Sequence, residues 1–432
     1  MHDARSRQQQ DPILWCALIA LGFLALCWIR IEIPARPYFD EIHYVPAARK
    51  LLELVRANAE HPMVGKEIIA GAIWLFGDEP LAWRIPSLLF GAFGLFAFSR
   101  MMWWLSGRTF ATIAATVLLV TSFAWFIQSR IAMLDMIMAG FGMVALWQFA
   151  AALHLPARRA RWCLAICGLC LGLAIGAKWS MAPAAMLPGL AFLVLRLRDK
   201  GARFLTASDT RPIPGISLIE AGLWLGVLPV VVYWASYAPT FFYADRPVSP
   251  LGFLEHHRHM LALQDSVKKL HPYRSVWYEW VIDWRAIWYL YEPIDGVHRG
   301  VLLIGNPFSM LAGLPALLWC LWAGIRRPRQ TRRDDAFALA LLYLCSIGLW
   351  IVSNKPIQFY YHYLLPGSFL MGCLALALDA IWNKGGKWRW LAVGAILAAI
   401  AMFAWFYPII SAAALPDGRP SYIKWMWLHS WR

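Results

Sequence analysis

The stretch from residue 162 to residue 196 reads WCLAICGLCLGLAIGAKWSMAPAAMLPGLAFLVLR. It contains two apolar runs, 162–178 and 180–196, which meet at Lys178 with almost no connecting loop. A helix needs about 20 predominantly apolar residues to cross the hydrocarbon core of a bilayer. The stretch therefore predicts two consecutive membrane-spanning helices with a lysine at the turn between them.

Runs of this kind recur along the whole chain of 432 residues, of which 60% are hydrophobic and only 15% are charged. A soluble domain carries roughly 25% charged residues, and the mean hydropathy of this chain is +0.52. We predict about eleven transmembrane helices, and hence an all-α polytopic membrane protein. Their expected limits are 12–29, 84–105, 110–128, 133–153, 162–178, 180–196, 217–236, 300–324, 336–353, 359–381 and 390–410.

The net charge of +15 is distributed unevenly along the chain. Most of the excess lysine and arginine falls in the N-terminal segment and in the connections that share its side of the membrane. These connections are 106–109, 154–161, 197–216, 325–335 and 382–389. Short basic connections mark the cytoplasmic side. The charge therefore predicts a cytoplasmic N-terminus and an external C-terminus, and it is not interpreted as a nucleic-acid-binding surface.

Two long segments remain on the external side, 30–83 and 237–299. The first contains an amphipathic stretch, 45–54, and an apolar stretch, 68–76, that is too short to span and is expected at the membrane interface. We divide the chain into an N-terminal catalytic region (1–236, including the loop 30–83), an external loop (237–299) and a C-terminal four-span region (300–432). No soluble domain of useful size is present, so any active site must be built from external loops and helix ends.

The first external segment carries several polar side chains. Asp40 and Glu41 follow the first span directly, and His61 and Lys66 lie further along the same segment. Arg84 opens the second span, where snorkelling to the interface is the ordinary interpretation. The adjacent acids are either a solvated turn or a functional pair, and His61 to Lys66 is either a helix start or part of a site.

More polar residues lie at other external helix ends. Arg130 and Asp135 are five residues apart between two spans, where an ion pair that shapes the turn is the simple alternative to a functional role. Arg84, Arg130 and Lys178 can meet at one depth of the outer leaflet, an arrangement that suits an anionic headgroup. His362 lies among tyrosines, where a histidine is more often structural than catalytic.

These residue types fit the transfer of a sugar from a lipid phosphate to a hydroxyl group. Phosphate is a good leaving group, so a single carboxylate is needed to take the proton of the acceptor. Cations are needed to neutralise the departing phosphate. No glycine-rich phosphate-binding loop occurs in the sequence, and a donor carried in the membrane makes one unnecessary.

Several ordered motifs resemble those of the protein O-mannosyltransferases. They are YFDEIHY (38–44), HPMVGK (61–66), RIAMLD (130–135), KW (178–179), HPYRS (271–275), WRAIWY (284–289), GNP (305–307) and YHYLLP (361–366), together with Arg84. The resemblance covers nearly the whole chain. Eukaryotic members carry a large soluble module before the last four spans, and the segment 237–299 is too short to hold it. The chain therefore looks like a compact bacterial member.

The resemblance implies a GT-C-type glycosyltransferase in the bacterial plasma membrane. Its active site would face the periplasm or exterior. Its donor would be a polyprenyl-phosphate mannose, and its acceptors Ser and Thr of translocated proteins, with inversion at the sugar. By resemblance, Asp40 is the catalytic base, Glu41 its partner at the acceptor, and Arg84, Arg130 and Lys178 the donor-phosphate ligands. Further site candidates are His61, Lys66, Asp135 and His362. The resemblance implies that no cofactor is needed, although Asp40, Glu41 and His43 would offer ligands to a divalent metal.

Two other functions compete with this interpretation. Lipid A aminoarabinose transferases share the architecture and also use a lipid-phosphate sugar, but their acceptor is a glycolipid. A lipid or solute transporter would be expected to show inverted repeats and broken helices with charges at the bilayer midplane. The sequence shows neither, because its charges gather at the ends of the spans.

Overall fold

The computed structural model describes residues 9–266, 271–326, 331–353, 355–416 and 421–432. Within these ranges nine helices are long and apolar enough to cross a membrane, and two shorter apolar helices have 16 and 12 residues. Ten of the eleven expected spans fall on one helix or on consecutive helical segments, and the span expected at 300–324 begins in a strand. The helices of these spans are α1 (Ile13–Trp28), α4 (Pro80–Ser106), α5 (Thr109–Val120), α6 (Phe123–Gln128), α7 (Leu134–Ala152), α8 (Ala157–Ala177), α9 (Ala182–Lys200), α10 (Leu218–Gly222), α11 (Leu228–Ala235), α14 (Pro307–Ile325), α15 (Asp334–Val352), α16 (Leu364–Trp382) and α17 (Lys387–Ile410).

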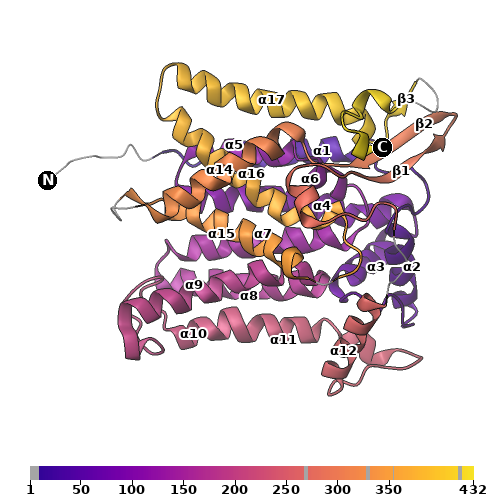
Figure 1. Cartoon of the computed structure of the whole chain (residues 1–432). Coiled ribbons are helices and arrows are strands. Elements are labelled where there is room, and N and C mark those ends of the chain that lie inside the picture. The colour runs from indigo at the N-terminus through magenta and orange to yellow at the C-terminus, as the bar shows by residue number, and fades with distance from the viewer. Residues whose placement is uncertain (1–8, 267–270, 327–330, 354, 417–420) are drawn as a thin grey trace.

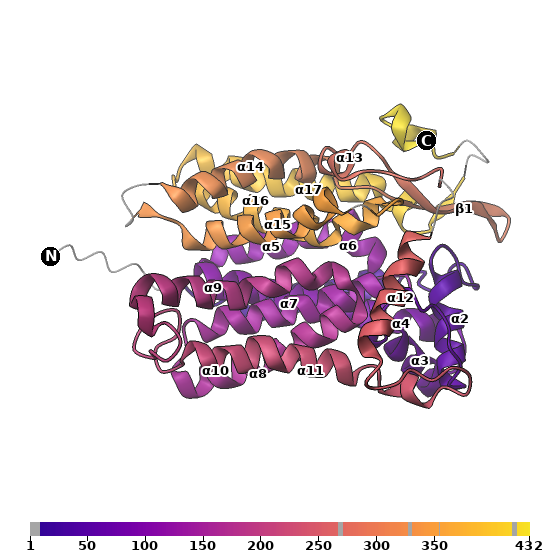
Figure 2. The same ribbon diagram turned by 60° about the horizontal axis from the view of Figure 1, so that its bottom comes forward.

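The membrane helices run side by side in one bundle (Figure 1). Helices α14 to α17 form one side of it and α7 to α11 the other, as both views show (Figures 1 and 2). Small residues let neighbouring helices approach closely, as is usual in membranes. A Cβ atom placed on Gly94 of α4 would lie 3.1 Å from the Cα of Gly140 in α7. The two backbones are therefore almost in contact at this crossing.

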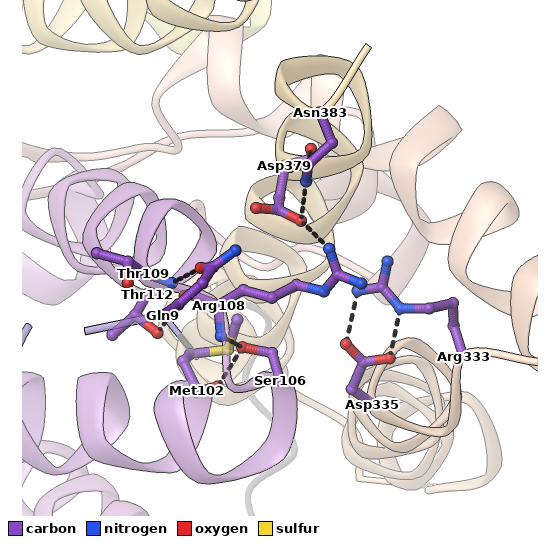
Figure 3. Close-up of polar contacts among 10 residues, drawn as sticks. All are labelled: Gln9, Met102, Ser106, Arg108, Thr109, Thr112, Arg333, Asp335, Asp379 and Asn383. Carbon is purple, nitrogen blue, oxygen red and sulfur yellow. Dashed lines mark hydrogen bonds and ion pairs between the residues drawn. The ribbon is translucent and has the colours of Figure 1, made fainter. Parts of the chain in front are cut away.

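At one end of the bundle, ion pairs tie the two halves of the chain together (Figure 3). Arg108, between α4 and α5, donates to Asp379 of α16 at 2.9 Å, and Asn383 donates to the same carboxylate oxygen at 2.9 Å. Arg333 and Asp335 form a second pair beside it, with a shortest distance of 2.6 Å. We call this the basic end. Arg327 and Arg329 of the expected basic connection lie outside the described residues.

The opposite end carries the long connections, and we call it the loop-rich end. Its short helices are α2 (Glu41–Leu52), α3 (Val64–Phe76), α12 (Phe253–Asp265) and α13 (Trp277–Val281). The buried face of α3 packs onto the bundle, whereas Trp74, Leu75 and Phe76 at its end are 60–74% exposed. This exposure fits the predicted interfacial position of α3.

A small sheet at the loop-rich end was not predicted from the sequence. It has the order β1-β2-β3, with β1 (Ile287–Ile294), β2 (Val297–Leu303) and β3 (Ala414–Leu415), all antiparallel. Asp295 and Gly296 form the two-residue turn between β1 and β2, both with positive φ, which is the geometry that Asp-Gly favours in hairpins.

The hairpin corrects one expected boundary. The apolar run assigned to a span at 300–324 begins inside β2, and α14 starts only at Pro307. Asn306 caps this helix by accepting the N–H of Ser309 at 3.3 Å, and proline is favoured in the first helical turn. The boundary drawn at residue 299 therefore cuts through a strand. Apart from this sheet, the predicted all-α membrane architecture is confirmed.

Candidate active site

Arg84 lies in the first turns of α4, and its side chain is completely buried. Its Nε and Nη2 atoms donate to the two carboxylate oxygens of Glu41, each at 2.8 Å. Its remaining N–H groups donate to backbone carbonyls of Ile31 (2.8 Å), Pro34 (3.0 Å) and Arg36 (3.2 Å). A guanidinium has five N–H donors. All five therefore have protein acceptors, which leaves none for a ligand.

Glu41 is equally buried and equally occupied. Besides binding Arg84, it accepts the backbone N–H of Tyr38 at 3.2 Å and that of Ala132 at 2.8 Å. The ion pair thus joins the loop before α2, the start of α4 and the connection between α6 and α7. The predicted roles of Glu41 at the acceptor and Arg84 at the donor phosphate do not fit this geometry. We assign both as positioning residues that hold the segment carrying Asp40.

The Glu41–Arg84 pair disfavours the binding of a metal ion by Asp40, Glu41 and His43. Glu41 would have to leave its arginine to coordinate such an ion. In the described part of the chain, no group of three or more His, Cys, Asp or Glu side chains is placed to hold a metal.

Asp40 stands immediately before α2, and its carboxylate makes no hydrogen bond with any described residue. The preceding Phe39 has a φ of +49°, which is unusual for a residue with a side chain and costs about 1–3 kcal/mol. The Phe39 ring stacks on Tyr289 with centroids 3.8 Å apart and meets Tyr361 edge-on at 6.1 Å. These rings hold the strained residue in place and so fix the position of Asp40.

Several charged groups act on the Asp40 carboxylate. Burial raises the pKa of Asp40 to about 6; the Lys178 ammonium opposes this rise, and the Asp135 carboxylate adds to it. His43 and Lys355 oppose it more weakly. Asp40 is therefore ionised at neutral pH, yet it is more basic than an ordinary aspartate, as a general base requires.

Lys178 and Asp135 form a buried ion pair. The Lys178 ammonium donates to both Asp135 oxygens, at 2.8 and 2.7 Å, and lies 4.9 Å from the centre of the Tyr361 ring. Asp135 begins α7, and Lys178 lies in the turn between α8 and α9, so the pair joins two connections of the loop-rich end. Lys178 also lies close enough to Asp40 for its charge to act on that carboxylate.

Arg130 has a different neighbourhood from the one predicted. Its guanidinium donates to the backbone carbonyls of Cys27 (3.2 Å) and Ile29 (2.6 Å) at the end of α1. It therefore caps carbonyls that a helix end leaves unsatisfied, and Asp135 pairs with Lys178 instead. This geometry favours a role for Arg130 in holding α1 rather than in binding phosphate.

Lys355 was not identified from the sequence. It lies in the short connection after α15, and its Nζ atom makes no hydrogen bond or ion pair with any described residue. The pKa of Lys355 is lowered to about 8, chiefly by burial and also by the neighbouring Lys178 ammonium, while the carboxylates of Asp135 and Asp40 oppose this lowering. Lys355 is thus a second cation beside Asp40. The only signal in the sequence was a lone lysine between two spans on the external side.

The remaining candidates surround this centre. His61 packs edge-on against Tyr44 with ring centroids 5.7 Å apart. The Lys66 ammonium donates to the carbonyls of Asn58 (2.7 Å) and His61 (2.8 Å) and so shapes the loop between α2 and α3. His362 stacks on Trp350 at 3.8 Å.

His362 also helps to line a narrow cavity next to the Lys178–Asp135 pair. The cavity is too narrow to hold a water molecule, and Asp135, Ser180 and Ser346 are among its other lining residues. The Nδ1 atom of His362 accepts the backbone N–H of Phe359 at 3.1 Å, whereas its Nε2 atom is buried without a partner among the described residues.

The site therefore combines one unpaired carboxylate with two lysines at the end of a membrane bundle. The carboxylate can accept a proton from a hydroxyl nucleophile. The lysines can stabilise the negative charge that develops on a departing phosphate. The Glu41–Arg84 pair and the Phe39–Tyr289 stack hold the carboxylate in place.

Solved structures with the same fold are membrane-embedded glycosyltransferases of the GT-C type. The Saccharomyces cerevisiae protein O-mannosyltransferase Pmt1-Pmt2 complex bound to its sugar donor matches 99% of this chain and 93% of its own, with a TM-score of 0.80 and 14% identity. ArnT from Cupriavidus metallidurans bound to undecaprenyl phosphate matches 94% of this chain and 67% of its own, with a TM-score of 0.58 and 16% identity. At these identities the likeness concerns the fold alone.

Sequence comparison narrows the class to one family. The model of dolichyl-phosphate-mannose-protein mannosyltransferases matches residues 81–243, and that of the C-terminal four-span region of protein O-mannosyltransferases matches 251–431. The polyprenol-phosphate-mannose–protein mannosyltransferase of Mycolicibacterium smegmatis (strain MKD8) is 26% identical, covering 92% of this chain and 88% of its own. The Corynebacterium glutamicum enzyme of that name is 27% identical with the same coverage. This chain belongs to the protein O-mannosyltransferase family and is an integral membrane glycosyltransferase.

Proposed function

We propose that this protein transfers mannose from a polyprenyl-phosphate carrier to Ser and Thr hydroxyls of proteins outside the cytoplasm. The observation that carries the proposal is the unpaired Asp40 carboxylate beside Lys178 and Lys355, in a chain of this family. Donor and acceptor class follow the names of the relatives, which are polyprenol-phosphate-mannose–protein mannosyltransferases. The family models and these names favour a protein acceptor over lipid A, and neither supports a transporter.

The reaction follows from the arrangement of these groups. Asp40 takes the proton of the acceptor hydroxyl as its oxygen attacks the anomeric carbon of the sugar. The bond between that carbon and the phosphate oxygen breaks, and the electron pair leaves with the lipid phosphate. Lys178 and Lys355 stabilise the phosphate as its charge develops. Attack from the face opposite the phosphate gives inversion at the anomeric carbon.

The proposed location is the bacterial plasma membrane, with the loop-rich end on the external face. Most of the basic connections lie at the other end, as expected for the cytoplasmic side. A reporter fused after Arg432 should be active only outside the cytoplasm, and activity only inside would contradict this orientation.

A deletion strain tests the proposed function in cells. Mass spectrometry of its secreted and membrane proteins should show the loss of hexose from Ser or Thr, and wild-type protein should restore it whereas Asp40→Asn should not. An unchanged set of glycosylated peptides would reject the proposal, and loss of a sugar from lipid A alone would favour the glycolipid alternative.

Replacement of Lys355 tests its role at the phosphate. We expect Lys355→Gln to raise the KM for the lipid-phosphate donor about 10- to 100-fold, because a hydrogen bond to a charged group contributes about 1.5–3 kcal/mol. Its KM for a peptide acceptor should change little. Lys384→Gln, at the exposed basic end, is the matched control. An unchanged donor KM would remove Lys355 from the site.

The pH dependence of kcat/KM follows from the same two residues. Asp40 is active when deprotonated, so the rate should rise as pH increases through about 6. Lys355 is active when protonated, so the rate should fall as pH increases through about 8. Lys355→Gln should abolish the alkaline limb and move the acidic limb upward, because a cation that favours ionised Asp40 is gone. An acidic limb near pH 4 in the wild type would contradict the raised pKa of Asp40.

A further inference from the structure

An open groove of about 680 Å³ lies at the loop-rich end, beside the hairpin that projects there (Figure 1). Aromatic side chains dominate its lining, which comprises Tyr273, Trp288, Tyr289, Leu290, Tyr291, Tyr422 and Arg432. We call it the aromatic groove. It is separate from the small cavity at His362, and the reaction described above does not account for it.

A β-bulge builds the floor of the groove. The pairing of β1 with β2 shifts between Trp288 and Leu290, so Tyr289 is an extra residue in β1. In a regular strand Trp288 and Tyr291 would point to opposite faces, but a bulge redirects the side chains that follow it. Here the Trp288 and Tyr291 rings lie together with centroids 4.9 Å apart, and each meets Tyr422 nearly at right angles, at 5.6 and 4.9 Å.

The bulged residue connects the groove with the catalytic carboxylate. Tyr289 lines the groove and also stacks on Phe39, the residue before Asp40. Its side chain is only 5% exposed, and its hydroxyl has no hydrogen-bond partner among the described residues. Asp135 and Asp40 are the charged groups that act most strongly on this hydroxyl. A buried hydroxyl without a partner at this junction is available to a substrate.

We propose that the aromatic groove binds the acceptor polypeptide as an extended, proline-rich segment and leads its Ser or Thr past Tyr289 to Asp40. Grooves lined by tyrosine and tryptophan bind the polyproline II conformation, which is already extended and loses little entropy on binding. Aromatic side chains also provide rigid contact area with few rotatable bonds.

This inference rests on the proposed function, and acceptor length separates the two in one experiment. The probes are a blocked single-threonine amide and two longer peptides with one threonine each, flanked by proline-rich or glycine-rich sequence. The purified full chain in lipid nanodiscs should have its lowest KM with the proline-flanked peptide. Trp288→Ala and Tyr422→Ala should raise that KM about 10- to 30-fold, as expected for aromatic anchors, and leave kcat/KM for the threonine amide unchanged.

Trp390→Ala is the matched control, because Trp390 is 78% exposed near the start of α17. The start of this helix lies at the opposite end of the bundle from the hairpin (Figure 1). Equal losses with the short and long acceptors would overturn the groove assignment, since they would mean a general structural effect. An unchanged KM for the long peptide would also overturn it. The groove assignment fails in the same way if the variants leave this KM unchanged and alter only the self-association of the protein. If the wild type modifies none of the three acceptors, the proposed function fails and the groove assignment fails with it.

Discussion

Asp40→Asn is expected to reduce turnover about 10²- to 10⁴-fold, the usual contribution of a positioned general base. The substitution preserves the size of the side chain but removes its basicity. A serine or threonine hydroxyl is a weak nucleophile until its proton is taken, so the effect should fall on kcat with a peptide acceptor. The carboxylate makes no hydrogen bond with any described residue, so the variant should keep the stability of the wild type.

Donor binding separates loss of catalysis from loss of structure in this variant. The affinity of Asp40→Asn for the lipid-phosphate sugar should be equal to or slightly greater than that of the wild type, because a negative charge near the phosphate is removed. Near-wild-type turnover in folded Asp40→Asn would place the base elsewhere. Asp135 would then be the next candidate. Among the described residues it accepts from Lys178 alone, whereas Glu41 accepts from Arg84 and from two backbone N–H groups.

Arg84→Met and Glu41→Gln are expected to lower the free energy of unfolding by about 3–5 kcal/mol each, because each leaves a buried partner without its counter-charge. Both side chains of the pair are 0% exposed, and the pair joins three segments around Asp40. Activity should fall with stability in both variants. Thermal unfolding in detergent, followed by activity at a temperature where each variant is folded, separates the two effects.

An exposed ion pair provides the control for this prediction. Arg36 and Glu292 are also paired, but their side chains are 60% and 31% exposed, and such pairs contribute only about 0–1 kcal/mol. Arg36→Ala should therefore unfold almost like the wild type. The double variant Arg84→Met/Glu41→Gln should be less destabilised than the sum of the two single variants. Additive losses would mean that the two side chains do not act as a pair.

The membrane helices could be predicted from the sequence because the bilayer requires long apolar runs. The interfacial stretch at 68–76 followed from the same rule, since its length is too short to span. The hairpin was missed because residues 300–303 are apolar and continue into α14, so that strand and helix appear as one run. The Asp295-Gly296 turn signal was present but was not used.

The candidate site was only partly predictable. Lys178 lies close enough to act on Asp40. Arg84 and Arg130, which were expected to meet Lys178, bind protein acceptors instead, because helix ends and loops place carbonyls and Glu41 around them. Spacing along the chain does not reveal which cation is already satisfied. The charge of Lys355 acts on Asp40 although the two residues are more than 300 positions apart in sequence, and no local pattern reveals such proximity.

The most direct test of the central claim uses purified protein in nanodiscs with a polyprenyl-phosphate mannose donor and a threonine-containing peptide. Wild-type protein should add one hexose to the threonine hydroxyl, with the anomeric configuration opposite to that of the donor, and Asp40→Asn should not. Mass spectrometry locates the hexose, and NMR of the product gives the configuration. Retention of the donor configuration, or transfer only to a glycolipid acceptor supplied in the same membrane, would contradict the account.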